Sequence, residues 1–242
     1  RLCRTGDELA AKKEHVELLA SRKVDALIFI GSHFVEKNAK DNAYLYGASN
    51  NVPVFLLNGL LRHDNIYSIL CDDETGAYEL TRICLEKGAK DPVFIASRDT
   101  FSMRRKFQGF LKACRQYGIE KDDSAFRVFS EDPESLDASY TLLFDESAYD
   151  ALICADDEIA AVAQRAARNH GIRVPEDLMV TGYNDSVIAT IASPAITSLD
   201  NRAQYMCTQA VYGLTQVLDG KEFPEETMYS GKVVERESTK RT

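Results

Sequence analysis

Short apolar runs alternate along this chain with longer segments in which apolar residues recur every three or four positions. The runs have the length of β-strands, and the periodic segments, roughly 10 to 16 residues each, have the pattern of amphipathic helices. The expected strands are 24–31, 53–58, 67–72, 92–97, 126–130, 150–155, 177–184, 197–200 and 232–238. The expected helices are 7–22, 74–88, 103–118, 133–145, 157–170 and 202–219, and residues 37–49 are compatible with one more.

This alternation predicts an α/β protein. Strands that alternate with helices of this length form βαβ units and parallel sheets. The strand runs are apolar throughout, as expected where helices cover both faces of a sheet. There are too many strands for one five-stranded sheet, and no repeat period indicates a solenoid or a barrel. We therefore expect two similar lobes, each a doubly wound parallel sheet, with ligands bound outside the carboxyl ends of the strands.

The composition is that of a globular protein with a sizeable core. Of the 242 residues, 45% are hydrophobic and 28% are charged, and the longest apolar run, 26–31, is far shorter than the roughly 20 residues of a membrane-spanning helix. The net charge of −9 argues against nucleic-acid binding by these residues themselves. The six cysteines are scattered without a CxxC pair, which favours a reduced, cytoplasmic protein.

Polar side chains follow most of the expected strands. They are Ser32-His33, Asn58, Asp72-Asp73, Ser97-Arg98-Asp99, Glu131-Asp132, Asp156-Asp157 and Asn184-Asp185. Taken singly, each is better explained as a cap for the helix that follows. Taken together, carboxylates and amides at so many strand ends favour a pocket that hydrogen-bonds vicinal hydroxyls or amides of a small ligand.

Catalytic motifs are absent from the sequence. It contains no GxGxxG after a strand, no GxxxxGK[ST], no GxSxG and no HExxH, and its four histidines are dispersed. The basic cluster Arg104-Arg105-Lys106 fits either an anion site at the start of its helix or plain surface charge. We therefore expect no enzyme activity, no cofactor and no metal.

Seven segments, taken in order, resemble the effector-binding core of the LacI/GalR family of bacterial transcription regulators. They are ELLASRKVDALIFIG, VPVFLLN, CDDETGAYELTRICLEKGAKDPVFIA, SMRRKFQGFLKACRQYGI, DALICADDEIAAVAQRAARNHGIRVPEDLMVTGYND, PAITSLDN and VVERES. The resemblance runs from about Thr5 to Thr239. A single segment would be a weak match, but the complete ordered set is specific.

The resemblance implies a periplasmic binding protein-like fold of type I, with two lobes joined by a three-strand hinge. The N-terminal lobe would comprise 1–71 plus 202–222, without its first βα unit, and the C-terminal lobe 72–201 plus 223–242. The hinge strands would pass near Cys71-Asp72, Asp200–Arg202 and Lys221–Pro224. The implied partners are a small polar effector, a second copy of the chain, and operator DNA contacted through a helix-turn-helix headpiece. Residues would then precede Arg1 in the native protein.

Carried over position by position, the resemblance also implies an effector site. Its residues are Asn58, Cys71, Ser102, Lys106, Asp156, Asn184 and Asn201. Asn58 and Asn184 stand where the family usually has Asp, and Lys106 stands where it usually has Arg, which loses a planar fork suited to two hydroxyls. An aromatic residue often found near Glu131 is also missing. These departures favour an unusual sugar, a phosphorylated sugar or a small polar metabolite over an ordinary free sugar.

Two other functions fit the architecture less well. A solute-binding protein of a transport system shares the two-lobe plan, but it needs an export signal and tolerates oxidising conditions, which the scattered cysteines oppose. An enzyme of the doubly wound class would need a nucleophile or cofactor motif. The sequence leaves open the effector, the operator, and whether the ligand strengthens or releases DNA binding.

Overall fold

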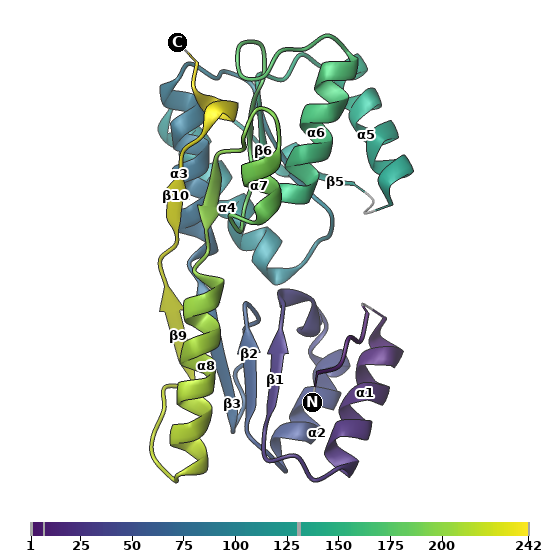
Figure 1. Ribbon diagram of the computed structural model, residues 1–242, viewed down its shortest axis with the longest axis vertical. Coiled ribbons are helices and arrows are strands. Elements are labelled where there is room, and N and C mark those ends of the chain that lie inside the picture. The colour runs from purple at the N-terminus through teal and green to yellow at the C-terminus, as the bar shows by residue number, and fades with distance from the viewer. Residues whose placement is uncertain (1, 7, 130–131, 242) are drawn as a thin grey trace. The chain divides into compact units, whose positions relative to one another are not determined.

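The computed structural model describes residues 2–6, 8–129 and 132–241. By its internal contacts the chain divides into two compact units (Figure 1). Unit 1 comprises Arg1–Cys71, Thr100–Ser102 and Ala203–Tyr229. Unit 2 comprises Asp72–Asp99, Met103–Arg202 and Ser230–Thr242.

Unit 1 is built on a parallel sheet of four strands in the order β1-β2-β3-β9. The strands are β1 (Leu27–Ile30), β2 (Val54–Leu57), β3 (Ile66–Cys71) and β9 (Glu226–Tyr229). The helices are α1 (Leu9–Ser21), α2 (Ala43–Ser49) and α8 (Ala203–Leu218), with short 3-10 turns at Ser32–Phe34 and Ala39–Asn42. Every residue of β2 is buried, as expected for an inner strand covered on both faces. In contrast, β1 buries only alternate residues.

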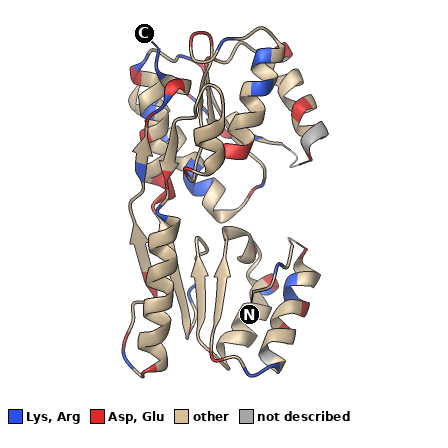
Figure 2. Ribbon diagram, in the orientation of Figure 1, with Lys and Arg blue, Asp and Glu red and all other residues tan. Residues whose placement is uncertain are grey.

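Helix α8 has no charged residue, and its ribbon is tan throughout in Figure 2. It buries Met206, Ala210 and Gly213. A side chain at Gly213 would come within 2.6 Å of the Phe223 ring, so the glycine allows the close approach of that ring. Helix α8 contacts β2 and β3 and thereby covers one face of the unit 1 sheet.

Unit 2 contains a second parallel sheet, in the order β5-β4-β6-β7. Its strands are β4 (Pro92–Ala96), β5 (Phe126–Val128), β6 (Ala151–Cys154) and β7 (Met179–Thr181). Its helices are α3 (Asp73–Glu86), α4 (Phe101–Gln116), α5 (Pro133–Glu146), α6 (Asp157–Asn169) and α7 (Val187–Ile191), with 3-10 turns at Asp123–Ala125 and Glu237–Thr239. A separate antiparallel pair joins β8 (Ser198–Asp200) to β10 (Lys232–Val234).

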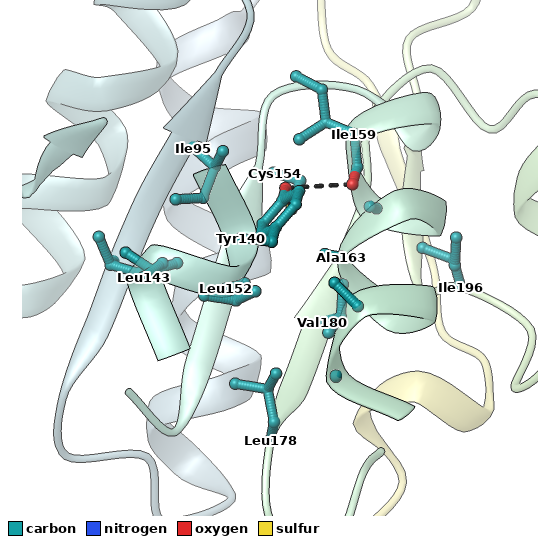
Figure 3. Close-up of a cluster of buried hydrophobic side chains, with 14 of the residues drawn as sticks. Ile95, Tyr140, Leu143, Leu152, Cys154, Ile159, Ala163, Leu178, Val180 and Ile196 are labelled. Atoms are coloured by element: carbon teal, nitrogen blue, oxygen red, sulfur yellow. Dashed lines mark hydrogen bonds between the residues drawn. The ribbon is translucent and has the colours of Figure 1, made fainter. Parts of the chain in front are cut away.

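Two apolar clusters cover the two faces of the unit 2 sheet. The cluster shown in Figure 3 joins α5 and α6 to the sheet around the fully buried Tyr140, whose hydroxyl donates to the Ile159 carbonyl at 3.1 Å. The other cluster packs the rings of Phe94, Phe107 and Phe110 under α3 and α4. Helices therefore lie on both faces, which confirms the predicted doubly wound α/β arrangement.

The structure adds two elements that the sequence pattern did not predict, β9 and α7, and it ends the last strand at Val234 instead of residue 238. Strand β5 ends at Val128, and residue 130, the last of the expected strand 126–130, lies outside the described part of the chain, as does the strand-end residue Glu131. Residues 226–229 pair with β3. They therefore belong to unit 1, whereas the resemblance assigned 223–242 to the other lobe. Among the described helices, none combines the length and apolar character needed to cross a membrane.

Candidate binding site

The implied site residues fall into two groups. Asn58, Cys71 and Ser102 belong to unit 1, and Lys106, Asp156, Asn184 and Asn201 belong to unit 2. In both groups most positions come directly after a strand or at the start of a helix, because the carboxyl ends of parallel strands meet at one edge of each sheet.

Asn58 and Cys71 are neighbours at the carboxyl edge of the unit 1 sheet. Asn58 follows β2 with a positive φ of 59°, a conformation that Asn adopts more readily than most residues. Its side-chain oxygen accepts the backbone N–H of Cys71 at 3.1 Å. The Cys71 side chain is buried, and so is Ser102, in the first turn of α4. The amide of Asn58 therefore bridges the ends of β2 and β3.

Lys106 carries a buried positive charge, with 4% of the residue exposed. Its ammonium group donates to the Ala155 carbonyl at 2.9 Å and lies 3.6 Å from the centre of the Tyr183 ring. The Tyr183 hydroxyl in turn donates to Asp73 at 2.8 Å. A buried ammonium group requires such partners, because removal from water without them is costly. The contacts with Ala155 and Tyr183 therefore fix the position of the Lys106 ammonium group at the end of β6.

The other two members of the basic cluster are ion-paired near the surface. Arg104 pairs with Asp99 at 2.6 Å, and Arg105 lies 3.2 Å from Glu74. The sequence left two interpretations of this cluster, an anion site or plain surface charge, and surface charge fits both arginines. Of the three residues, only Lys106 is directed into the protein.

Asp156 is the N-cap of α6, and its Oδ1 accepts the backbone N–H of Ile159 at 2.8 Å. Burial raises the pKa of this carboxyl above its ordinary value, while the Ile159 hydrogen bond and the charge of Lys106 act in the opposite direction. The capping interpretation is thus confirmed for Asp156, and it holds also for Asp72 at α3 and Asp132 at α5.

The turn after β7 holds Asn184 and Asp185 in the left-handed region, with φ of 93° and 49°. Asn184 accepts a hydrogen bond from the Asn201 amide at 2.8 Å, and Asp185 forms an ion pair with Arg236 at 2.7 Å. These two contacts help to hold a backbone conformation that costs free energy in non-glycine residues.

Asp157 stabilises the same turn through hydrogen bonds. Its carboxylate accepts the Ser186 backbone N–H at 2.7 Å and the Ser198 hydroxyl at 2.6 Å, and the Ser198 oxygen accepts the backbone N–H of Asp185 at 3.0 Å. A side chain at Gly182 would collide with this carboxylate. The structure therefore brings Lys106, Asp156, Asn184 and Asn201 to the carboxyl edge of the unit 2 sheet, where a polar network holds the turn that contains Asn184.

The supporting network combines predicted and unpredicted residues. Asp73 and Asp157 are among the polar residues that the sequence places after strands, but sequence reasoning missed Tyr183, Ser198 and Arg236. The signal available for Tyr183 was its position directly before Asn184. Within the described residues, no group of three or more His, Cys, Asp or Glu side chains could hold a metal ion.

Comparison with known proteins identifies the class and then the family. A family model described as a periplasmic binding protein-like domain matches residues 81–239. An HTH-type transcriptional regulator of Lachnoclostridium phytofermentans is 31% identical over 239 residues, covering 98% of this chain and 72% of that protein. The chain therefore has a periplasmic binding protein-like domain. More narrowly, it belongs to the LacI/GalR family of transcription regulators and represents their effector-binding core.

Solved structures agree with this fold. The transcription regulator CcpA of Lactococcus lactis superimposes with a TM-score of 0.87 at 21% identity, over 99% of this chain and 87% of that chain. A complex of the transcriptional regulator CelR with cellobiose gives a TM-score of 0.83 at 24% identity, over 95% of this chain and 70% of the other.

Proposed function

We propose that this chain binds a small polar effector, a sugar or a sugar-like metabolite, and couples it to the DNA affinity of a transcription regulator. The observation that carries the proposal is the buried ammonium group of Lys106 beside Asp156, at the same sheet edge as the Asn184–Asn201 pair. We assign to Asn58, Cys71 and Ser102 the same ligand. The role is one of binding, not catalysis, because the curated relatives are regulators.

The chemistry of these groups favours an effector with acidic or strongly accepting oxygens. Asn184 uses its side-chain oxygen to accept from Asn201, so its amide N–H groups are the ones that face a ligand's acceptors. Asn58 and Asn184 replace two carboxylates of the family pattern, and Lys106 keeps its positive charge. A phosphorylated sugar or a sugar acid is therefore tolerated where two carboxylates would repel it.

We further propose that the chain acts as a homodimer in the cytoplasm and reaches operator DNA through a helix-turn-helix headpiece. Its net charge of −9 is unsuited to contact with phosphates, which supports assigning DNA contacts to another segment. In this scheme the effector shifts DNA affinity only by the difference between its affinities for the two states of the regulator.

A thermal-shift panel tests the proposal. The probes are cellobiose, glucose, glucose 6-phosphate and gluconate. A ligand at about 100 times its Kd stabilises a protein by about 2.7 kcal/mol, which raises the Tm by roughly 5 to 11 °C at this chain length. We expect such a rise with at least one of the two anionic probes and a smaller one, or none, with glucose.

Two variants locate the effect. Lys106→Met removes the charge but keeps an unbranched side chain, and Asp156→Asn keeps the side-chain oxygen that caps α6. Both should abolish the ligand-induced rise, whatever they do to the unliganded Tm. The matched control is Asp177→Asn, which removes a carboxylate paired with Arg173 at 2.6 Å before β7, at the other edge of the sheet. An undiminished rise in both site variants would contradict the proposal.

A further inference from the structure

A cavity of about 840 Å³ opens at the amino-terminal edge of the unit 2 sheet. Its walls come from the last turns of α4, residues 118–125, Arg127 of β5 and Tyr149. We call it the α4-end cavity. Residues 118–125 precede β5 and Tyr149 precedes β6, so the cavity lies at the sheet edge opposite to Asp156 and Asn184. Its volume is within the range of small-molecule sites.

Two guanidinium groups of this cavity are not committed to carboxylates. The Nε of Arg127 is buried and has no hydrogen-bond partner among the described residues, and its Nη2 reaches only the Tyr149 hydroxyl, at 3.4 Å. Buried donors are nearly always satisfied in folded proteins, so an unpaired one needs an explanation. Arg115, in the last turn of α4, is exposed and forms no ion pair within the described part of the chain.

The remaining charges of the cavity are largely engaged. Lys121 pairs with Asp91, and Asp122 accepts the Ser124 backbone N–H at 2.8 Å as the cap of a 3-10 turn. This hydrogen bond and that of the Ser124 side chain lower the pKa of Asp122. Glu120 is exposed. The lining thus carries three cations, Arg115, Lys121 and Arg127, against the two carboxylates of Glu120 and Asp122. Because neither guanidinium group is paired with a carboxylate of the described residues, this balance favours an anionic ligand.

Part of the cavity lining is apolar. Leu111, Ile119 and Ala125 are lining residues that belong to the apolar cluster under α4 or pack against it. Tyr149 adds an aromatic ring to the lining. A ligand that matches both the apolar and the charged residues has an apolar body and an acidic head, which the planar forks of arginine bind in pairs of hydrogen bonds.

We propose that the α4-end cavity binds a small organic anion with a carboxylate or phosphate head and an apolar or aromatic body. This is a second ligand site, beyond the effector site proposed above. Helix α4 joins the two places, since Lys106 is near its start and Arg115 near its end. The nine residue steps from Lys106 to Arg115 span roughly 14 Å along the helix axis, and the two residues lie toward opposite edges of the sheet, so the two ligand sites are distinct.

Phenyl phosphate is the probe, and its Kd is measured by ligand-observed NMR titration on the unmodified chain. Phenol and inorganic phosphate, each with half of the probe's chemistry, are titrated in parallel. Arg127→Gln and Arg115→Gln should each weaken phenyl phosphate binding about tenfold or more, because a hydrogen bond to a charged group contributes about 1.5 to 3 kcal/mol. Lys112→Gln is the matched control, since this exposed residue of α4 does not line the cavity.

The outcomes separate the alternatives. Loss of binding in both arginine variants, with binding kept in Lys112→Gln and Lys106→Met, supports the proposal. Equal weakening by Lys112→Gln indicates nonspecific charge attraction and overturns it, as does the absence of saturable binding. Inorganic phosphate that binds as tightly as phenyl phosphate overturns the assigned ligand class. Loss of binding in Lys106→Met alone would place the probe in the effector site and overturn the proposal for the α4-end cavity. The sugar panel described above tests the effector site separately.

Discussion

Lys106 shows how one buried charge can organise a site. The ammonium group is held by the Ala155 carbonyl and the Tyr183 ring, and it offsets part of the rise that burial causes in the pKa of Asp156. The cost of burying a lysine is tolerated where its contacts are fixed in advance, which is typical of binding sites. In the effector site that we propose, a ligand would meet a charge that needs no rearrangement before binding.

The position of Lys106 could have been predicted more firmly from the sequence. It lies four residues before Phe110 and seven before Ala113, both fully buried, and residues at these spacings share one face of a helix. The apolar face of α4 thus already included Lys106. The φ values of Asn184 and Asp185 could not be predicted, because they depend on Arg236 and Asp157, which are distant in the sequence.

Buried thiols make the stability of the chain sensitive to alkaline pH. Burial raises the pKa of Cys84 and of Cys114 from the ordinary thiol value to about 12. Above about pH 9 the unfolded chain loses these protons while the native state keeps them, so the free energy of unfolding falls as pH rises. Urea denaturation between pH 7 and pH 10.5 should show this fall.

The Cys84→Ala/Cys114→Ala double variant should reduce that pH dependence, even though its stability at pH 7 is lower. Cys3→Ser is the control, since Cys3 is exposed, and it should leave the profile unchanged. If the double variant loses stability with pH as steeply as the unmodified chain, the buried thiols are not responsible.

At the scale of elements, α3 and α4 pack so closely that only glycine fits at position 109. A side chain there would overlap the Glu74 carbonyl oxygen and come within 2.8 Å of the Tyr78 nitrogen. Gly109→Ala should therefore lower the free energy of unfolding by about 1 to 3 kcal/mol, the usual cost of overpacking.

Gly47→Ala provides the comparison for that substitution. Gly47 lies within α2, and nothing approaches within 4 Å of an added Cβ. Alanine favours the helix there by about 0.5 to 1 kcal/mol. Denaturant titrations should thus give changes of opposite sign for the two variants. Equal stability of Gly109→Ala and the unmodified chain would show that the helices can separate at little cost.

Most strands and helices followed from their hydrophobic pattern, and the exceptions have physical reasons. Strand β9 reads Glu-Thr-Met-Tyr, with alternate residues exposed, because it is an edge strand and lacks the apolar run of an inner strand. Helix α7 has only five residues, too few for a helical period to show. The pairing of β9 with β3 depends on contacts between residues more than 150 positions apart, which no local pattern contains.

At the scale of the whole molecule, neither unit is a continuous stretch of sequence. Unit 1 takes residues 203–229 from late in the chain, and unit 2 takes its last segment from 230–242. The assembly of each unit therefore depends on contacts between distant parts of the chain, which no local sequence pattern contains.

Amide hydrogen exchange with and without ligand tests the central claim most directly. With glucose 6-phosphate or gluconate, whichever raises the Tm more, we predict slower exchange in residues 182–186 and 156–160. These segments hold the turn after β7 and the first turn of α6. Exchange in residues 117–125, at the other edge of the sheet, should not change. Protection confined to residues 117–125 would contradict the account. So would the absence of protection in residues 182–186 and 156–160 with a ligand that stabilises the chain.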